Sequence, residues 1–208
     1  MQADSHQVLL ILGAGGHGRV VADAALRAGG WTRVLATDRD PARCSGDLLP
    51  GVLCLPIEAA LEEAGTWHVA IGDAASRVRE CGALGARAFA CIIHPGASVS
   101  PFAHLAPGCL VAAGAVVAPG ARIGEHGIVN HGAVVDHDCD IGPFCHLAPQ
   151  SALGGGVRLG RGVMVGSGAR VLPGLEVADD VVIGAGAVVH RSIREVGTYV
   201  GVPARRMK

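Results

Sequence analysis

The feature that most constrains this 208-residue chain is an aliphatic residue at every sixth position, from Ile93 without interruption to Val189. A period of six matches neither the 3.6-residue period of an α-helix nor the alternation of a single strand. It fits a parallel β-helix, a solenoid in which each hexad forms one flat side and the aliphatic side chains stack inside. If three hexads close one coil, residues eighteen apart in sequence lie above one another.

Composition and charge limit the class of protein further. Aromatic residues make up only 3 % of the chain, as expected for a core built from layers of small aliphatic side chains. The net charge of −1, without a dense run of lysine and arginine, argues against a nucleic-acid footprint. The N-terminus lacks a signal-peptide pattern, no apolar stretch is long enough to span a membrane, and the cysteines form no C-x-x-C pair. We therefore expect a cytoplasmic protein with reduced thiols that does not insert into membranes.

The segment before the repeat alternates short apolar runs with helical patterns, which predicts a small parallel sheet flanked by helices. The expected strands are 7–12, 33–36, 68–71 and about 88–92, and the expected helices are 19–27, 57–64 and 74–84. We place the domain boundary near residues 91–95. The predicted fold class is an α/β, Rossmann-like βαβ domain over residues 1–92, followed by a β-helix with a C-terminal tail over residues 93–208.

A glycine loop follows the first expected strand. Gly13, Gly15 and Gly18 satisfy G-x-G-x-x-G, and the acidic Asp38 follows about twenty residues later. A dinucleotide-binding fold pairs two mononucleotide-binding halves. The roughly ninety residues before the repeat can form only one such half, so this domain suits one bound nucleotide better than two. The loop N–H groups and the helix N-terminus form an anion site, to which His17 adds a donor. The alternative is that the glycines only permit close packing of strand against helix.

The repeat contains one segment that indicates acid–base chemistry. His137 lies two places after the inward-pointing Val135, near a corner, and is flanked by Asp136 and Asp138. A carboxylate beside an imidazole orients the ring and favours its protonated form, as a general base requires when it takes up a proton. His146 lies half a coil further on. On one coil the two histidines would occupy different sides, so a shared site would need a neighbouring subunit.

These segments resemble the hexapeptide-repeat acyltransferases that acetylate bacterial nucleotide-linked amino sugars and sialic acid. The resemblance covers essentially the whole chain. Its markers are the glycine loop, Asp38, Ala70-Ile-Gly-Asp73 with Arg77, Asp136-His-Asp138 and the closing Gly201-Val-Pro-Ala-Arg205. It implies a left-handed β-helix, a homotrimer, and acetyl-coenzyme A (acetyl-CoA) as co-substrate between adjacent helices, with no metal.

The resemblance also assigns roles to residues of the repeat. His137 is similar to the general base and Asp138 to its acidic modulator. His146 corresponds to the residue that reaches the acetyl thioester, and Ser167 and Ala185 correspond to backbone positions along the pantetheine arm. Arg205, with Arg206 and Lys208, could attract the 3′-phosphate of CoA, although a solvated basic tail is the alternative.

The expected substrate-binding residues lie mostly before the repeat. They are Gly15, Gly16, His17, Asp38, Arg39, Gly72 and, within the repeat, Asn130. Two positions depart from the family pattern: Asp73 stands where many relatives have Asn, and Arg39 replaces a frequent acid. These departures leave open whether the nucleotide is UDP, GDP or CMP.

The predicted activity is acetyl transfer from acetyl-CoA to the amino group of a nucleotide-linked 4-amino-4,6-dideoxy sugar, with His137 as general base. O-acetylation of sialic acid or of another sugar hydroxyl is the alternative. Two hypotheses come from other classes. One is a zinc-dependent lyase of the carbonic anhydrase type with His126 and His131 as ligands, and the other is a non-catalytic nucleotide-sugar-binding scaffold.

Overall fold

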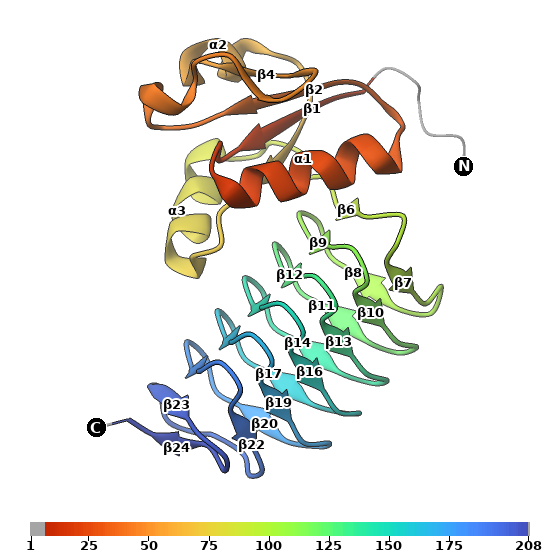
Figure 1. The fold of residues 1–208 in the computed structure, drawn as a ribbon, viewed down its shortest axis with the longest axis vertical. Helices are drawn as coiled ribbons and strands as arrows, with labels where there is room; N and C mark the ends of the chain where they lie inside the picture. The colour runs from red at the N-terminus through yellow and green to blue at the C-terminus, as the bar shows by residue number, and fades with distance from the viewer. Residues whose placement is uncertain (1–6, 208) are drawn as a thin grey trace. The chain divides into compact units, whose positions relative to one another are not determined.

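The structure is a computed structural model that describes residues 7–207. The chain divides after Pro95 into two compact units. Figure 1 shows the sheet and helices of the first unit and the stacked coils of the second. Within the described residues, none of the helices is both long and apolar enough to cross a membrane.

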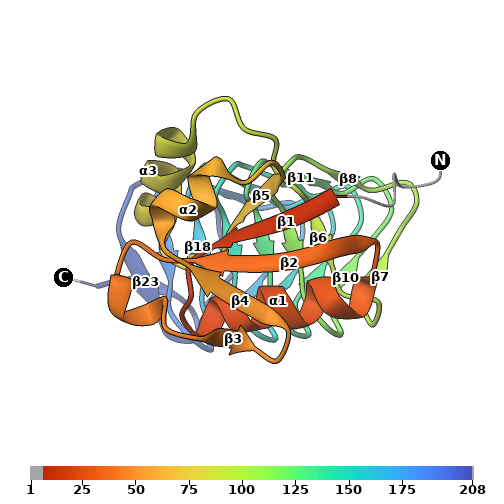
Figure 2. The same ribbon diagram turned by 90° about the horizontal axis from the view of Figure 1, so that it is seen from above.

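The first unit is an α/β layer structure around one five-stranded sheet. The strand order is β3-β4-β2-β1-β5, and all neighbours are parallel except β3 and β4. The strands are β1 (Gln7–Leu12), β2 (Trp31–Thr37), β3 (Asp47–Leu49), β4 (Val52–Leu55) and β5 (Thr66–Val69). The helices are α1 (Gly16–Ala28), α2 (Ile57–Glu62), α3 (Ala74–Leu84) and the single 3₁₀ turn η1 (Pro41–Arg43). Figures 1 and 2 show α1 and α2 on opposite faces of the sheet.

Most of the expected elements of this unit are confirmed, with several differences. Strand β2 is longer than predicted at both ends, and α2 ends two residues earlier. Helix α1 begins at Gly16 rather than at 19, because the end of the glycine loop forms its first turn. Strand β5 begins and ends two residues earlier than predicted. The continuous strand expected at about 88–92 is wrong: the chain forms one bridge between Trp67 and Phe89 and then the short β6 (Ile92–Ile93). The β3–β4 hairpin was not predicted.

The second unit is a parallel β-helix whose coils each contain three short strands, one on each of three sides. Side 1 contains β7 (Ser98–Val99), β10 (Val116–Val117), β13 (Val134–Val135), β16 (Ala152–Leu153), β19 (Arg170–Val171) and β22 (Val188–Val189). Side 2 contains β8 (His104–Leu105), β11 (Arg122–Ile123), β14 (Asp140–Ile141), β17 (Arg158–Leu159) and β20 (Glu176–Val177). Side 3 contains β9 (Leu110–Val111), β12 (Ile128–Val129), β15 (His146–Leu147), β18 (Met164–Val165), β21 (Val182–Ile183), β23 (Thr198–Val200) and the antiparallel β24 (Arg205–Arg206).

The strand register confirms the predicted three hexads per coil. Val117 pairs with Val135, and Val135 pairs with Leu153, each partner being eighteen residues further along the chain. The repeated aliphatic residues from Val111 to Val189 are buried. The exceptions are at the start of the run, where Val99 and Leu105 are half-buried and Ile93 is 36 % exposed.

Glycine and small residues permit the close stacking of coils at the corners. A Cβ atom on Gly142 would lie 2.6 Å from the backbone carbonyl carbon of Gly160 in the next coil. Cys109, Cys139 and Cys145 occupy small-residue positions, and each Sγ donates to a backbone carbonyl oxygen at 3.2, 3.3 and 3.0 Å, respectively. All seven cysteines are free.

Candidate active site

A pocket of about 380 Å³ lies where β1, β2 and β5 end. All six residues of the first unit that were expected to bind the nucleotide sugar line it: Gly15, Gly16, His17, Asp38, Arg39 and Gly72. The carboxyl ends of neighbouring parallel strands meet at one edge of a sheet, so the loops that follow β1, β2 and β5 converge. The fold thus brings together residues that lie far apart in the sequence.

The glycines of the loop divide into two groups. Gly13 has a φ of +119°, and a Cβ atom there would lie 2.6 Å from the carbonyl oxygen of Ala70. A Cβ atom on Gly18 would collide with the carbonyl oxygen of Gly13. These two positions therefore serve close packing, whereas a Cβ atom on Gly16 would meet no atom within 4 Å. Because α1 has no side-chain N-cap and no acidic residue in its first turn, its first N–H groups suit an anion in the pocket.

The Asp38 carboxylate ties two loops of the pocket together. Its Oδ2 accepts a hydrogen bond from the N–H of Ala14 at 2.8 Å, and its Oδ1 accepts one from the N–H of Asp40 at 3.0 Å. Nη1 of Arg43 lies 3.6 Å from Oδ2 and close above Gly15. Asp38 therefore fixes the shape of the glycine loop, and Arg43 brings a cation to the N-terminus of α1.

Helix α3 supplies a second wall of the pocket. The Glu80 side chain of this helix is buried. Its Oε2 accepts a hydrogen bond from Nε of Arg39 at 2.9 Å, and its Oε1 lies 3.5 Å from Nε of Arg79. The helix is capped by Asp73, whose Oδ2 accepts a hydrogen bond from the N–H of Ser76 at 2.8 Å and whose pKa is lowered by that bond. Sequence reasoning missed the pocket residues Arg43, Ser76, Arg79 and Glu80, because no motif marks them.

Arg77 holds the loop that follows β5. Its side chain is buried, and its Nη1 donates to the carbonyl oxygens of Ile71 and Gly72 at 2.7 and 2.9 Å. The guanidinium thereby fixes the backbone that forms the floor of the pocket beside Gly72.

His137 lies at the corner between side 1 and side 2 of the β-helix. Its Nδ1 is 2.8 Å from Oδ2 of Asp138, and its backbone N–H donates to Oδ1 of Asp136 at 2.7 Å. The hydrogen bond to Asp138 raises the pKa of the His137 imidazole, and the charge of Asp136 raises it further. The His137 side chain is 63 % exposed in the single chain.

Two glycines make room for this pair of side chains. A Cβ atom on Gly155, in the next coil, would lie 2.5 Å from Nε2 of His137. A Cβ atom on Gly120, in the preceding coil, would lie 2.5 Å from Oδ1 of Asp138. The imidazole therefore packs against the backbone of Gly155 in the next coil, and the carboxylate packs against the backbone of Gly120 in the preceding coil.

His146 lies on side 3, where it pairs with Asn130. Nε2 of His146 is 3.2 Å from Nδ2 of Asn130, and Oδ1 of Asn130 accepts a hydrogen bond from the N–H of His131 at 2.8 Å. Because that backbone donor fixes the amide orientation, Nδ2 of Asn130 is the donor and Nε2 of His146 is the acceptor. A neutral His146 consequently carries its proton on Nδ1.

Ser167 and Ala185 stack at the corner between side 3 and side 1. The N–H of Gly186 donates to the carbonyl oxygen of Ser167 at 2.9 Å, which places the two corner residues in adjacent coils. The structure thus groups Ser167 and Ala185 at one edge of the side that carries His146. It does not bring His137 to them within one chain, because the corner of sides 1 and 2 lies opposite side 3 of a three-sided prism.

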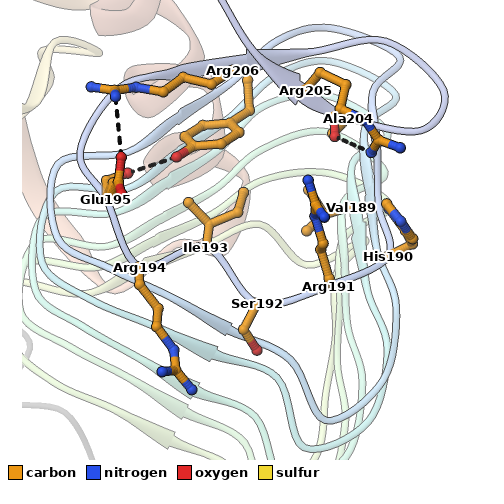
Figure 3. Close-up of a pocket in the computed structure, with 11 residues that line it drawn as sticks. Val189, His190, Arg191, Ser192, Ile193, Arg194, Glu195, Ala204, Arg205 and Arg206 are labelled. Atoms are coloured by element: carbon orange, nitrogen blue, oxygen red, sulfur yellow. Dashed lines mark hydrogen bonds and ion pairs between the residues drawn. The ribbon is translucent and has the colours of Figure 1, made fainter.

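Arg205 lies in a separate basic pocket of about 430 Å³ at the C-terminal end of the β-helix. Figure 3 shows Arg191 and Arg205 beside each other, with Arg206 paired to Glu195 across from them. Nη1 of Arg206 is 3.1 Å from Oε2 of Glu195, whereas Nη1 of Arg205 bonds to the carbonyl oxygen of Ala204 at 3.0 Å. The expected contribution of Lys208 falls outside the described residues.

The zinc-lyase hypothesis has no support in this geometry. The His126 ring is buried and stacks on Phe144, with centroids 5.1 Å apart. Across residues 7–207, no group of three or more His, Cys, Asp and Glu side chains is placed to hold a metal ion.

Comparisons with known proteins identify the family. Residues 8–81 match the model of the PglD N-terminal domain, and residues 156–191 match the bacterial transferase hexapeptide model of six repeats. No curated protein sequence matches the chain at a significant level.

Two solved structures are similar to almost the whole chain. The acetyltransferase domain of PglB from Neisseria gonorrhoeae FA1090 is 34 % identical with a TM-score of 0.88, over 97 % of this chain and 100 % of that one. A histidine-to-alanine variant of GDP-perosamine N-acetyl transferase from Caulobacter crescentus, in complex with CoA and GDP-perosamine, is 38 % identical with a TM-score of 0.87, over 96 % of each chain. The chain belongs to the hexapeptide-repeat sugar acetyltransferases. As predicted for that family, its fold is a Rossmann-like domain followed by a left-handed β-helix.

Proposed function

We propose that this protein is an acetyl-CoA-dependent N-acetyltransferase that acts on the amino group of a nucleotide-linked 4-amino-4,6-dideoxy sugar in bacterial glycan biosynthesis. The observation that carries the proposal is the His137–Asp138 pair on a β-helix whose partner domain holds a nucleotide-sized pocket. The relatives support acetyl-CoA as the donor and an amine as the acceptor: one is described in complex with acetyl-CoA, and another is a GDP-perosamine N-acetyl transferase.

The chemistry is ordinary acyl transfer. The neutral amine of the sugar attacks the thioester carbonyl carbon, and Nε2 of His137 accepts the proton that the nitrogen loses. Backbone N–H groups stabilise the oxyanion of the tetrahedral intermediate. The carbon–sulfur bond then breaks, the CoA thiolate leaves, and an amide remains on the sugar.

The outward faces of the β-helix support a homotrimer as part of this proposal. Side 2 carries an exposed ladder of charged and polar residues, namely His104, Arg122, Asp140, Arg158 and Glu176. Side 1 instead presents mostly apolar residues, namely Val116, Val134, Ala152 and Val188. A threefold assembly repeats one heterologous contact, which would let the His137 corner of one subunit meet the His146 side of the next. The acetyl-CoA site would then combine His137 and Asp138 with His146, Ser167 and Ala185 of a neighbour, while Asn130, which pairs with His146, would bind the substrate.

The basic C-terminal pocket and the cellular compartment complete the proposal. Arg205 would attract the 3′-phosphate of CoA, since several guanidinium groups surround this pocket.

The cytoplasm is the proposed location, because free thiols persist in a reducing compartment.

The function is tested by the release of free thiol from acetyl-CoA. We expect release to depend on a nucleotide-linked 4-amino sugar, and the product to be an amide that resists mild base. Release that depends instead on sialic acid, with a base-labile ester as product, would support the O-acetyltransferase alternative. A folded protein that releases thiol with neither class of acceptor would leave the non-catalytic scaffold as the better hypothesis.

The proposed role of Asp138 predicts a shift of the pH–rate profile. A general base must be neutral, so activity rises with pH as the His137 imidazole loses its proton. Asp138 raises the pKa of that imidazole above its usual value of 6.5, which places the acidic limb of the profile at higher pH. In Asp138→Asn we expect the acidic limb to move to lower pH, with a reduced maximal rate because the ring is less well oriented. Measuring kcat/KM against pH tests this, and an unmoved limb would mean that Asp138 does not control His137.

A further inference from the structure

The pair formed by Arg39 and Glu80 is the part of the nucleotide pocket that the binding of phosphates does not explain. The Glu80 side chain is only 9 % exposed although it lines the pocket, and Nε of Arg39 donates to its Oε2 at 2.9 Å. A carboxylate repels phosphate, and Glu80 does not hold the glycine loop as Asp38 does, because its contacts are with Arg39 and Arg79. A buried acid on a pocket wall instead suits a ligand group that donates hydrogen bonds.

The topology of the sheet places this pair where a base would lie. In the order β3-β4-β2-β1-β5, the chain first adds strands on one side of β1 and then adds β5 on the other side. The order of the strands therefore reverses at β1, and a crevice opens there between β1 and β5. The N-terminus of α1 lies on one side of that crevice and takes the phosphates. Helix α3, which follows β5, forms the other side and carries Ser76, Arg79 and Glu80 into the same pocket.

The hydrogen-bonding capacity of the pair narrows the choice of base. A carboxylate has about four lone-pair positions, and the two arginine contacts of Glu80 leave the others for a ligand. In the described part of the chain, Arg39 bonds only through Nε, so both of its Nη groups can donate. The guanidinium–carboxylate pair therefore offers donors next to acceptors.

Guanine matches this arrangement better than the other bases. Its N1–H and N2–H₂ groups are adjacent donors that one carboxylate can accept together, and its O6 and N7 are acceptors for an arginine. Uracil has one N–H between two carbonyl groups, so a carboxylate would also face a carbonyl oxygen. Cytosine and adenine each have an amino group beside a ring-nitrogen acceptor.

We propose that the pocket selects a guanine nucleotide, with Glu80 accepting from N1–H and N2–H₂ and Arg39 donating to O6. The inference rests on the proposed function in one respect, that this pocket holds the nucleotide of the sugar substrate. It makes Glu80 and Arg39 specificity residues that take no part in the acyl transfer itself.

Calorimetric titration of the intact protein with GDP, IDP, UDP and CDP tests the proposal without acetyl-CoA. We expect GDP to bind at least ~10-fold more tightly than UDP or CDP, because both pyrimidines lack the paired donors. IDP differs from GDP only by the missing 2-amino group, and we expect it also to bind ~10-fold more weakly. Equal affinity for GDP and IDP, or tighter binding of UDP or CDP, would overturn the guanine proposal.

The variant Glu80→Gln isolates the carboxylate. The amide keeps the shape but has one acceptor atom in place of two, so we expect the ratio of GDP to IDP affinity to fall below ~3-fold. Glu62→Gln is the matched control, since Glu62 is exposed at the end of α2 and should keep the wild-type ratio. A Glu80→Gln protein that retains the full ratio would exclude Glu80 as the reader of the base.

The results of these experiments distinguish the proposed acetyltransferase function from the guanine proposal. A GDP preference without thiol release from acetyl-CoA would contradict the proposed function and leave the guanine site standing. Thiol release with UDP-linked sugars only would contradict the guanine site and leave the acetyltransferase standing. A folded wild-type protein that binds none of the four nucleotides would overturn both.

Discussion

Replacing His137 by alanine is expected to lower turnover by about 10²–10⁴-fold while leaving the affinity for acetyl-CoA nearly unchanged. The reason is that Nε2 of His137 is proposed to take the proton from the attacking amine, whereas the ring is too exposed to contribute much to folding. Steady-state kinetics with the amino sugar nucleotide give kcat, and titration with CoA gives the affinity. His104→Ala is the matched control, because His104 is also exposed on the β-helix but lies on side 2.

The same variant tests whether the site is shared between subunits. His146→Ala is expected to be impaired as well, since it removes the residue proposed to reach the thioester. If His137 and His146 of one site come from different chains, co-assembly of the two variants in equal amounts should restore activity in about a quarter of the sites. A mixture as inactive as its parents, with mixed trimers demonstrated by mass, would contradict the composite site. Wild-type turnover in His137→Ala alone would remove His137 from the mechanism.

The β-helix was predictable from the sequence because its rule is local. Each hexad places one aliphatic residue inside, so the six-residue period predicts the strands. With three hexads in each coil it also predicts the spacing of eighteen residues that the register confirms. The burial of residues at the start of the repeat is predicted less well by this period, as the exposure of Ile93 shows. The first coil has a neighbouring coil on one side only, and its inward residues Val99 and Leu105 are half-buried.

The nucleotide pocket was predictable only in part. Its motif residues, such as Gly15 and Asp38, come soon after strands, were expected to bind the nucleotide sugar, and line the pocket. Glu80 and Arg43 reach the pocket from the middle of a helix and from a 3₁₀ turn, and no spacing in the sequence marks them. Their place depends on how α3 and the loop after β2 pack, which is tertiary information. The β3–β4 hairpin was missed for a similar reason, since strands of three and four residues are too short to show a pattern.

Gly155 is a residue that the sequence could have identified. It lies eighteen positions after His137, directly above it in the next coil once the period is known. Its backbone is outside the left-handed region, so glycine is not required there by conformation. The three atoms nearest to an added Cβ atom all belong to the His137 ring, with Nε2 at 2.5 Å. Glycine at 155 therefore leaves room for the imidazole that we propose as the general base.

Gly155→Ala is expected to lower kcat by about 10²-fold, because a methyl group would push the imidazole aside by roughly 1 Å. Since a side chain yields more easily than a backbone, the thermal stability of the variant should stay close to that of the wild type. Gly82→Ala is the control, because a Cβ atom on Gly82 would meet nothing within 4 Å.

A double-mutant cycle separates this positioning role from a general structural one. If Gly155 acts through His137, then Gly155→Ala should cost almost nothing in a protein that already carries His137→Ala. Independent effects, in which the two losses multiply, would mean that the methyl group damages the site by another route, such as the path of the pantetheine arm. The KM for acetyl-CoA distinguishes these outcomes, since a displaced imidazole lowers kcat and leaves cofactor binding intact, whereas an obstructed channel raises KM.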